Sequence, residues 1–370
     1  MRIAIMAPLV TAIREPQQGG SQAFVSDLAR GLAGRGHDVH VYAASGSQIP
    51  GVEVIDTGVD PRSLAGTLYR AFGPAGDPGA ADPGAAAAAQ AAGAAFAAAY
   101  GAVRAGRYDV VHNHAFDAPA VRLAQGLEAP VVHTMHLPPD QAVSAALREV
   151  ALGGRPPAVA TVSEFQAGAW RRVVPVDAVL PPYPPTRAIA WSQTGGPGAL
   201  FAGRLSPEKG AAEAIDIARA AGVPIEVYGD VYDAGYSQEQ IDPRRGWPGV
   251  TVHPGVPRAE LWEIMGRAAV VLCPSRWDEP FGLAAAEAQA SGTPVVAFRR
   301  GGLSEVIVDG VTGFLVPADD VAAAASAVVR ASGLSRAACR QHAESRLDLD
   351  VSLDAHERLY RKVAGPAGGG

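Results

Sequence analysis

Two carboxylates, Glu279 and Glu287, stand eight residues apart in the segment DEPFGLAAAEAQASGTPVVAF. Pro280 favours the first position of a helix, so the pattern predicts a helix that starts there and places Glu287 about two turns, or ~12 Å, further along. Amides in the first turn of a helix lack partners within it, and together with the helix dipole they bind anions. The expected donors are the amides of Phe281, Gly282 and Leu283.

The glycine among these donors, Gly282, lets a ligand approach the backbone closely because it has no side chain. A diphosphate bound there would leave Glu279 and Glu287 to contact different parts of the same ligand. The alternative interpretation is an ordinary helix with two solvated glutamates. We predict an anion site flanked by carboxylates.

A second group of charged residues, Arg204 and Lys209, lies in FAGRLSPEKG, where an apolar run ends. Open α/β sheets bind ligands beyond the carboxyl ends of their strands, and this loop has that position. Arginine can hold a phosphate through two hydrogen bonds, and lysine acts as a point charge. The alternative is an ordinary surface pair. With the glutamate segment also present, the loop predicts a clamp for a diphosphate.

Four histidines follow two further apolar runs, VVHNHAF and VVHTMHLPP. Alternation in an extended strand puts His112 and His114 on one side, and His133 and His136 end the next strand. We expect these histidines to line the substrate site, with His133 and His136 on the acceptor side, while a structural role is the alternative. Their spacing does not match a zinc motif, so no metal is expected.

The elements that must position these residues begin with the run RIAIMAP, which predicts a buried strand. A loop that ends in Gly19 and Gly20 follows, and then a helical pattern with Phe24, Leu28 and Leu32 on one face. A second strand, VHVYAA, completes a strand–helix–strand unit. The turn lacks the GxGxxG fingerprint, which argues against an enzyme that uses NAD or FAD.

The same alternation continues to the end of the chain and predicts an α/β protein of two Rossmann-like, doubly wound domains. A proline-rich stretch at 179–198 reads as the linker between them. We expect an amino-terminal domain over 1–182 and a carboxy-terminal domain over 183–347. A helix at about 348–363 is expected to cross back to the first domain. The Ala-, Gly- and Pro-rich segment 73–106 is open between an ordered helix over 85–105 and a low-complexity insertion.

The glutamate segment resembles the paired-glutamate signature of the retaining GT-B glycosyltransferases, the large family 4-like group that includes sucrose synthases and bacterial mannosyltransferases. The resemblance implies that Glu279 contacts the donor sugar and that Glu287 contacts the ribose of the nucleotide. Arg204 and Lys209 match the donor-phosphate clamp of the family, and His114 matches a histidine that meets the sugar. The resemblance thus implies that His114, Glu279, Arg204 and Lys209 act in catalysis.

Two glycine pairs extend the resemblance. Gly19 and Gly20 are similar to an amino-terminal pair whose amides reach toward the phosphates. Gly301 and Gly302 are similar to a late pair that faces the donor, with Gly313 at a turn beyond it. The matching pieces cover residues 1–45, 108–165 and 199–320. The chain departs from the family pattern at 60–106 and 232–249, and these departures leave the acceptor unidentified.

Composition limits the partners. The net charge of −6 gives no reason to expect nucleic acid, and no apolar run reaches the ~20 residues of a membrane span. The two cysteines show no zinc spacing and fit a reducing compartment, so we expect a cytoplasmic protein. The first apolar run is interrupted by Pro8 and reads as a strand rather than as a signal peptide.

The resemblance implies a retaining transferase that takes a nucleoside-diphosphate sugar. Because the sequence shows no paired-aspartate site, we expect no metal, and no cofactor is expected. UDP is favoured and GDP is the alternative nucleotide, and the acceptor is expected to be a small molecule, natural product or lipid. A phosphorylase or a sucrose- or trehalose-type synthase shares these features. A non-catalytic nucleotide-sugar binding protein is disfavoured because every clamp residue is retained.

Overall fold

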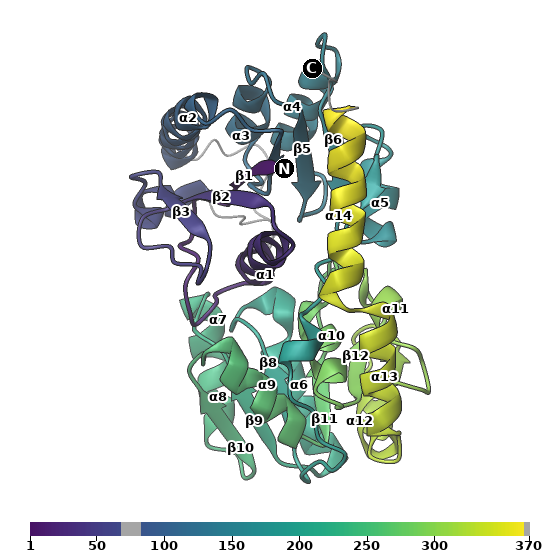
Figure 1. The fold of residues 1–370 in the computed structure, drawn as a ribbon. Helices are drawn as coiled ribbons and strands as arrows, with labels where there is room; N and C mark the ends of the chain where they lie inside the picture. Colours follow the sequence, from purple (N-terminus) through teal and green to yellow (C-terminus); the bar gives the residue numbers. More distant parts are fainter. Residues whose placement is uncertain (68–82, 366–370) are drawn as a thin grey trace. The chain divides into compact units, whose positions relative to one another are not determined.

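A computed structural model describes residues 1–67 and 83–365 of the chain (Figure 1). The described chain forms two compact units, each with its own sheet. The amino-terminal unit comprises Met1–Arg14, Ser21–Pro181 and Ser352–Gly370, and the carboxy-terminal unit comprises Glu15–Gly20 and Pro182–Val351. The chain therefore changes unit between Pro181 and Pro182, inside the proline-rich stretch.

The amino-terminal unit is built on a parallel seven-stranded sheet with the order β3-β2-β1-β4-β5-β6-β7. The strands are β1 (Arg2–Met6), β2 (Asp38–Ala43), β3 (Glu53–Asp56), β4 (Val110–Asn113), β5 (Val131–Met135), β6 (Ala158–Thr161) and β7 (Ala178–Val179). The helices are α1 (Gly20–Gly34), η1 (Pro61–Thr67), α2 (Pro83–Ala105), α3 (Ala118–Ala124), α4 (Gln141–Ala151) and α5 (Glu164–Trp170). Strands β1 and β4 are buried almost throughout, as expected for a parallel sheet covered on both faces.

The carboxy-terminal unit has a parallel six-stranded sheet with the order β10-β9-β8-β11-β12-β13. The strands are β8 (Ala199–Ala202), β9 (Ile225–Tyr228), β10 (Val250–His253), β11 (Val270–Cys273), β12 (Val295–Phe298) and β13 (Gly313–Val316). The longer helices are α6 (Ala211–Ala221), α9 (Arg258–Arg267), α10 (Leu283–Ala290), α12 (Val321–Ala331) and α13 (Arg336–Arg346). The short helices are η2 (Thr186–Ala188), η3 (Pro207–Lys209), α7 (Ala234–Tyr236), η4 (Ser237–Ile241), α8 (Asp242–Arg245) and α11 (Leu303–Val306).

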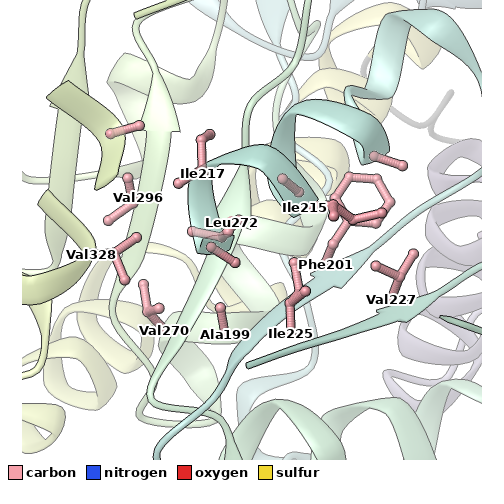
Figure 2. Packing of buried hydrophobic residues seen from close by; sticks show 14 of the residues in the cluster. Ala199, Phe201, Ile215, Ile217, Ile225, Val227, Val270, Leu272, Val296 and Val328 are labelled. Carbon is pink, nitrogen blue, oxygen red and sulfur yellow. The ribbon is translucent and has the colours of Figure 1, made fainter. Parts of the chain in front are cut away.

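Branched and aromatic side chains fill the space between this sheet and helices α6 and α12. Figure 2 shows Phe201 and Leu272 from the sheet close to Ile215 from α6 and Val328 from α12. All four are at least 95% buried, so the removal of apolar surface from water is the main force that fixes the strands beneath the site.

Helix α14 (Leu349–Ala364) is one continuous helix, drawn in yellow in Figure 1. Its first turn belongs to the carboxy-terminal unit, and the part from Ser352 onward belongs to the amino-terminal unit. Ser352 Oγ donates to the carbonyl of Pro181 at 2.6 Å. Leu353 packs so closely on Gly31 of α1 that a Cβ added there would lie 2.7 Å from Leu353 Cδ1. The lack of a side chain at Gly31 therefore allows α14 to pack closely against α1.

Two sequence expectations change, and one that was left open is decided. Helix α10 begins at Leu283 rather than at Pro280, because Gly282 has a φ of 106°, outside the right-handed helical region. Gly313 is the first residue of β13 and not part of a turn, and a Cβ there would meet the carbonyl of Val295. The helix expected over 85–105 is present as α2, while the loop expected before it lies largely outside the described residues.

Candidate functional site

Glu279 is held by three side chains at the carboxyl edge of the second sheet. Lys209 Nζ donates to Glu279 Oε1 at 2.8 Å and to Oε2 at 2.9 Å. Ser275 Oγ and Trp277 Nε1 also donate to Oε2, at 3.1 and 2.9 Å. The side chains of Lys209 and Glu279 keep 23% and 13% of their exposure, so a ligand can still reach the pair.

The ionisation of Glu279 follows from these contacts. Burial alone would raise the pKa of its carboxyl group, but the charge and hydrogen bonds of Lys209, with those of Trp277 and Ser275, outweigh it and hold the pKa below its ordinary value. Glu279 is therefore an anion at neutral pH.

The main chain of Glu279 is fixed by the glycine pair that follows β12. The amide of Gly302 donates to the carbonyl of Glu279 at 2.7 Å. Gly301 has a φ of 57°, and a Cβ there would lie 2.2 Å from the carbonyl oxygen and 2.5 Å from the nitrogen of Glu279. The pair allows two loops to approach closely, which is a reason for glycine that needs no ligand. The predicted contact of both glycines with the donor stays a prediction.

The start of α10 presents free amides beside Glu279. Gly282 is the N-cap residue, and its carbonyl accepts from the amides of Ala285 and Ala286. Within the described residues, the amides of Gly282, Leu283 and Ala284 donate to no protein acceptor. The amide of Phe281 likewise has no acceptor among the described residues, so all three predicted donors are free although the helix itself begins at Leu283. The binding of an anion there stays a prediction.

Gly20, of the amino-terminal glycine pair, lies beside the same start of α10. Gly20 is the first residue of α1 and is grouped with the carboxy-terminal unit, as is Gly19. A Cβ on Gly20 would lie 3.8 Å from Leu283 Cδ2. Gly20 therefore lies against the first residue of α10.

Arg204 follows β8 and lies over the ring of Tyr232, with 4.2 Å between the guanidinium carbon and the ring centroid. Its Nη2 donates to Glu208 Oε1 at 3.1 Å, and Ser206 Oγ donates to the same oxygen at 2.7 Å. The arginine side chain is 31% exposed, so it can exchange one of these partners for a phosphate.

Glu287 lies within α10 in a buried ion pair that the sequence did not reveal. Its Oε1 accepts from Arg258 Nε at 2.5 Å and from Trp262 Nε1 at 2.9 Å, both from α9. The amide of Arg258 donates in turn to Glu15 at 3.0 Å. The carboxylate predicted to meet a ribose thus also anchors α9 to α10.

In the amino-terminal unit, the histidines form a buried cluster with Phe24 and the carboxyl-terminal helix. His114 Nδ1 and His136 Nε2 are 2.9 Å apart and share one hydrogen bond. His112 is bonded to Tyr360 of α14 at 2.6 Å and to Thr134 at 2.7 Å. His112 and His114 have no exposed surface, so in this structure neither ring is open to solvent.

Burial lowers the pKa of each imidazole in this cluster. The pKa values of His112 and His114 lie well below the ordinary value, because of burial and because of the neighbouring imidazoles. Burial lowers the pKa of His133 and of His136 to about 4, and also that of His356. All five rings are therefore neutral at pH 7. His133 is bonded to Asn113 at 2.9 Å and is 1% exposed.

Four residues that support the site were not singled out from the sequence: Ser275, Trp277, Arg258 and Trp262. Only the position of Ser275 and Trp277 within four residues of Glu279 could have drawn attention to them. In the described part of the chain, no group of three or more histidine, cysteine, aspartate or glutamate side chains could hold a metal ion. None of the described helices has the length and apolar character that a membrane span requires.

Comparison with known proteins identifies the family. Residues 18–182 match the model for Glycosyltransferase Family 4, and residues 187–345 match that for Glycosyl transferases group 1. The chain is similar to the D-inositol 3-phosphate glycosyltransferase of Xylanimonas cellulosilytica, with 31% identity over 86% of this chain and 85% of the relative. The enzyme of the same name from Mycobacterium avium is also 31% identical, over 98% of this chain and 95% of the relative.

Solved structures show the same fold. The sucrose-phosphate synthase from Thermosynechococcus elongatus has a TM-score of 0.75 and 19% identity, with coverage of 98% of this chain and 99% of the other. Anabaena HepE, solved in complex with UDP and glucose, has a TM-score of 0.69 and 20% identity, with coverage of 97% and 99%. The two parallel sheets have the Rossmann-like architecture of GT-B proteins, and the chain is an enzyme that belongs to the family 4-like glycosyltransferases.

Proposed function

We propose that this enzyme transfers the sugar of a UDP-sugar donor to an acceptor hydroxyl with retention of the anomeric configuration. The observation that carries the proposal is the ion pair between Lys209 and Glu279 beside the free amides at the start of α10. Cations and amide donors suit a diphosphate, and an ionised carboxylate suits sugar hydroxyls.

The donor is assigned to the carboxy-terminal unit. Arg204 and Lys209 neutralise the charge that develops on the departing UDP, and the amides at Gly282 and Leu283 stabilise the same charge. Glu287 accepts from the ribose hydroxyls. UDP is favoured because Anabaena HepE, a fold relative, was solved with UDP and with UDP-glucose.

Glu279 acts by orienting the donor sugar rather than as a nucleophile. Its carboxylate already accepts from Lys209, Trp277 and Ser275, and these contacts favour the anion and reduce its tendency to form a covalent bond. The acceptor hydroxyl attacks on the face that UDP vacates, so the configuration is preserved. The bond between the sugar and UDP breaks as the glycosidic bond forms, and the proton of the hydroxyl passes to the departing diphosphate.

The acceptor is assigned to the amino-terminal unit. His114 is the residue of that unit expected to act in catalysis, with its Nε2 atom facing away from His136. Inositol 3-phosphate is the first acceptor to test, since the similar curated enzymes carry it in their names. A cytoplasmic location is supported by two free cysteines, Cys273 and Cys339.

The test is calorimetric titration of UDP, GDP, ADP and dTDP into the wild type and Arg204→Ala. Loss of a charge-assisted contact should weaken the binding of the preferred nucleotide by roughly 1.5 to 3 kcal/mol, or about tenfold or more. Arg219→Ala is the matched control, because Arg219 lies over Trp247 at 4.3 Å much as Arg204 lies over Tyr232. Equal binding by wild type and Arg204→Ala, or no binding of any nucleotide, would refute the clamp.

A further inference from the structure

The indole of Trp277 contacts both members of the ion pair at the donor site. Its Nε1 donates to Glu279 Oε2 at 2.9 Å, and Lys209 Nζ lies 5.3 Å from the centroid of its ring. The side chain is 93% buried, so it is packed firmly in place. One rigid side chain therefore fixes the carboxylate by a hydrogen bond and the ammonium group by its aromatic face.

The hydrogen bonds on Glu279 are distributed unequally between its two oxygens. Oε2 accepts from Lys209, Ser275 and Trp277, whereas Oε1 accepts from Lys209 alone among the described residues. A carboxylate oxygen has about two lone-pair sites, so Oε1 keeps acceptor capacity and Oε2 does not. Ser275 and Trp277, which donate to Oε2 and not to Oε1, thus determine which oxygen meets a ligand.

We propose that Trp277 is a positioning residue: it holds Glu279 and Lys209 in the arrangement that presents Glu279 Oε1 to a hydroxyl of the donor sugar. Ser275 supports the same orientation through its bond to Oε2. The assignment of the ligand rests on the proposed function, while the orientation of the carboxylate rests on the contacts of the two donors.

The ionisation of Glu279 reports on this role without any ligand. The titratable groups that face its carboxylate are Lys209 and the thiol of Cys273, at the end of β11. Burial raises the pKa of Cys273 to about 12, so that thiol stays neutral and Lys209 is the one charge in direct contact among the described residues. Removal of the indole N–H therefore removes a bond that favours the anion.

The experiment compares wild type with Trp277→Phe by carbon NMR of protein labelled at the glutamate side-chain carboxyl. The signal of Glu279 is assigned by its loss in Glu279→Gln. Phenylalanine keeps an aromatic face for Lys209 but has no N–H, so the titration midpoint of Glu279 is expected to move to higher pH. Trp247→Phe is the control, since Trp247 contacts Arg219 and Arg244 and is expected to leave the midpoint unchanged.

A structural role alone would lower the melting temperature of Trp277→Phe without moving the midpoint of Glu279, and that result would overturn the proposal. If Trp277→Phe does not fold, Ser275→Ala removes the other donor to Oε2 and is expected to move the midpoint in the same direction. UDP is titrated into the same samples. If wild type binds UDP and the midpoint does not move, only the role of Trp277 fails. If UDP does not bind and the midpoint moves, the donor assignment fails and the positioning stands.

Discussion

Glu287 and Arg258 form a buried ion pair, with 2.5 Å between Oε1 and Nε and with 6% and 9% of the side chains exposed. Glu287→Ala removes the carboxylate that faces the buried guanidinium group of Arg258, so it should lower the free energy of unfolding by about 3 to 5 kcal/mol. Glu287→Gln should cost less, because the amide oxygen still accepts from Trp262. Urea denaturation measures both.

The control for that comparison is Glu149→Ala, which breaks an exposed pair with Arg122 at 2.7 Å. Surface pairs contribute about 0 to 1 kcal/mol, so this variant should unfold close to wild type. Equal losses in Glu287→Ala and Glu149→Ala would show that burial of the first pair has no energetic consequence.

Gly301→Ala should disturb the site, because its Cβ would strike the main chain of Glu279. Gly310→Ala is the control that distinguishes this clash from backbone strain. Gly310 has a φ of 76°, against 57° for Gly301, but a Cβ added there would meet no atom within 4 Å. Gly310→Ala should lose about 1 to 2 kcal/mol from the left-handed conformation alone. Gly301→Ala should lose clearly more and also weaken UDP binding. Similar losses and unaltered UDP affinity would contradict the close approach.

The buried histidines should make the amino-terminal unit sensitive to acid. The folded pKa values of His133, His136 and His356 are about 4, below the ordinary value of 6.5. Below pH 6.5 the unfolded chain binds more protons than the folded one, so stability falls as the pH drops from about 7 toward 4. Hydrogen exchange of the β4 and β5 amides, corrected for intrinsic rates, should show protection lost between pH 7 and 5.

One carboxyl group in the same unit acts in the opposite direction. Burial and the charge of Asp140 raise the pKa of Asp117 to about 6. The contribution of Asp117 to the stability of the fold is therefore present at low pH and is lost as the pH rises through 6. Because several imidazoles oppose this one group, the net slope should follow the histidines. His136→Phe removes one imidazole and should flatten the dependence. Protection that is constant from pH 7 to 5 would rule out the neutral cluster.

Arg336 joins three segments of the carboxy-terminal unit through its guanidinium group. The acceptors are the carbonyls of Ser192, Ala268 and Gly266 and the hydroxyl of Thr293, at 2.6 to 2.9 Å. Lysine carries the same charge but cannot reach several acceptors at once, so Arg336→Lys should lower the melting temperature by an amount that corresponds to about 2 to 3 kcal/mol. Arg187→Lys, at an 85% exposed side chain, is the control and should melt with wild type.

The architecture could be predicted because parallel strands that are buried on both faces consist of continuous apolar runs. The loops that carry Arg204 and Glu279 directly follow two of these runs. The start of α10 was misplaced because Pro280 signalled a helix more strongly than Gly282 signalled a positive φ. The ion pair of Lys209 with Glu279 joins residues 70 positions apart, and no local pattern reports such a contact.

The surroundings of the histidines also depend on contacts between residues far apart in the chain, which the sequence pattern does not predict. Strand alternation indicates which side chains share a face, but not what covers that face. His112 is predicted to line the substrate site, which stays a prediction, and its ring is bonded to Tyr360, which lies 248 residues later in the chain. Only the return of α14 to the first unit determines that environment.

Ser352 and the residues after it belong to the amino-terminal unit. The synthesis of that unit therefore begins first but ends only after the residues of the carboxy-terminal unit have been added. The ribosome releases the first sheet early, but His356 and Tyr360, which finish its imidazole cluster, emerge only after the whole carboxy-terminal unit has been made. Domains fold as units during synthesis, so the second unit can close before the first. The amino-terminal unit, although it is translated first, therefore cannot complete its imidazole cluster until the residues of α14 have been made.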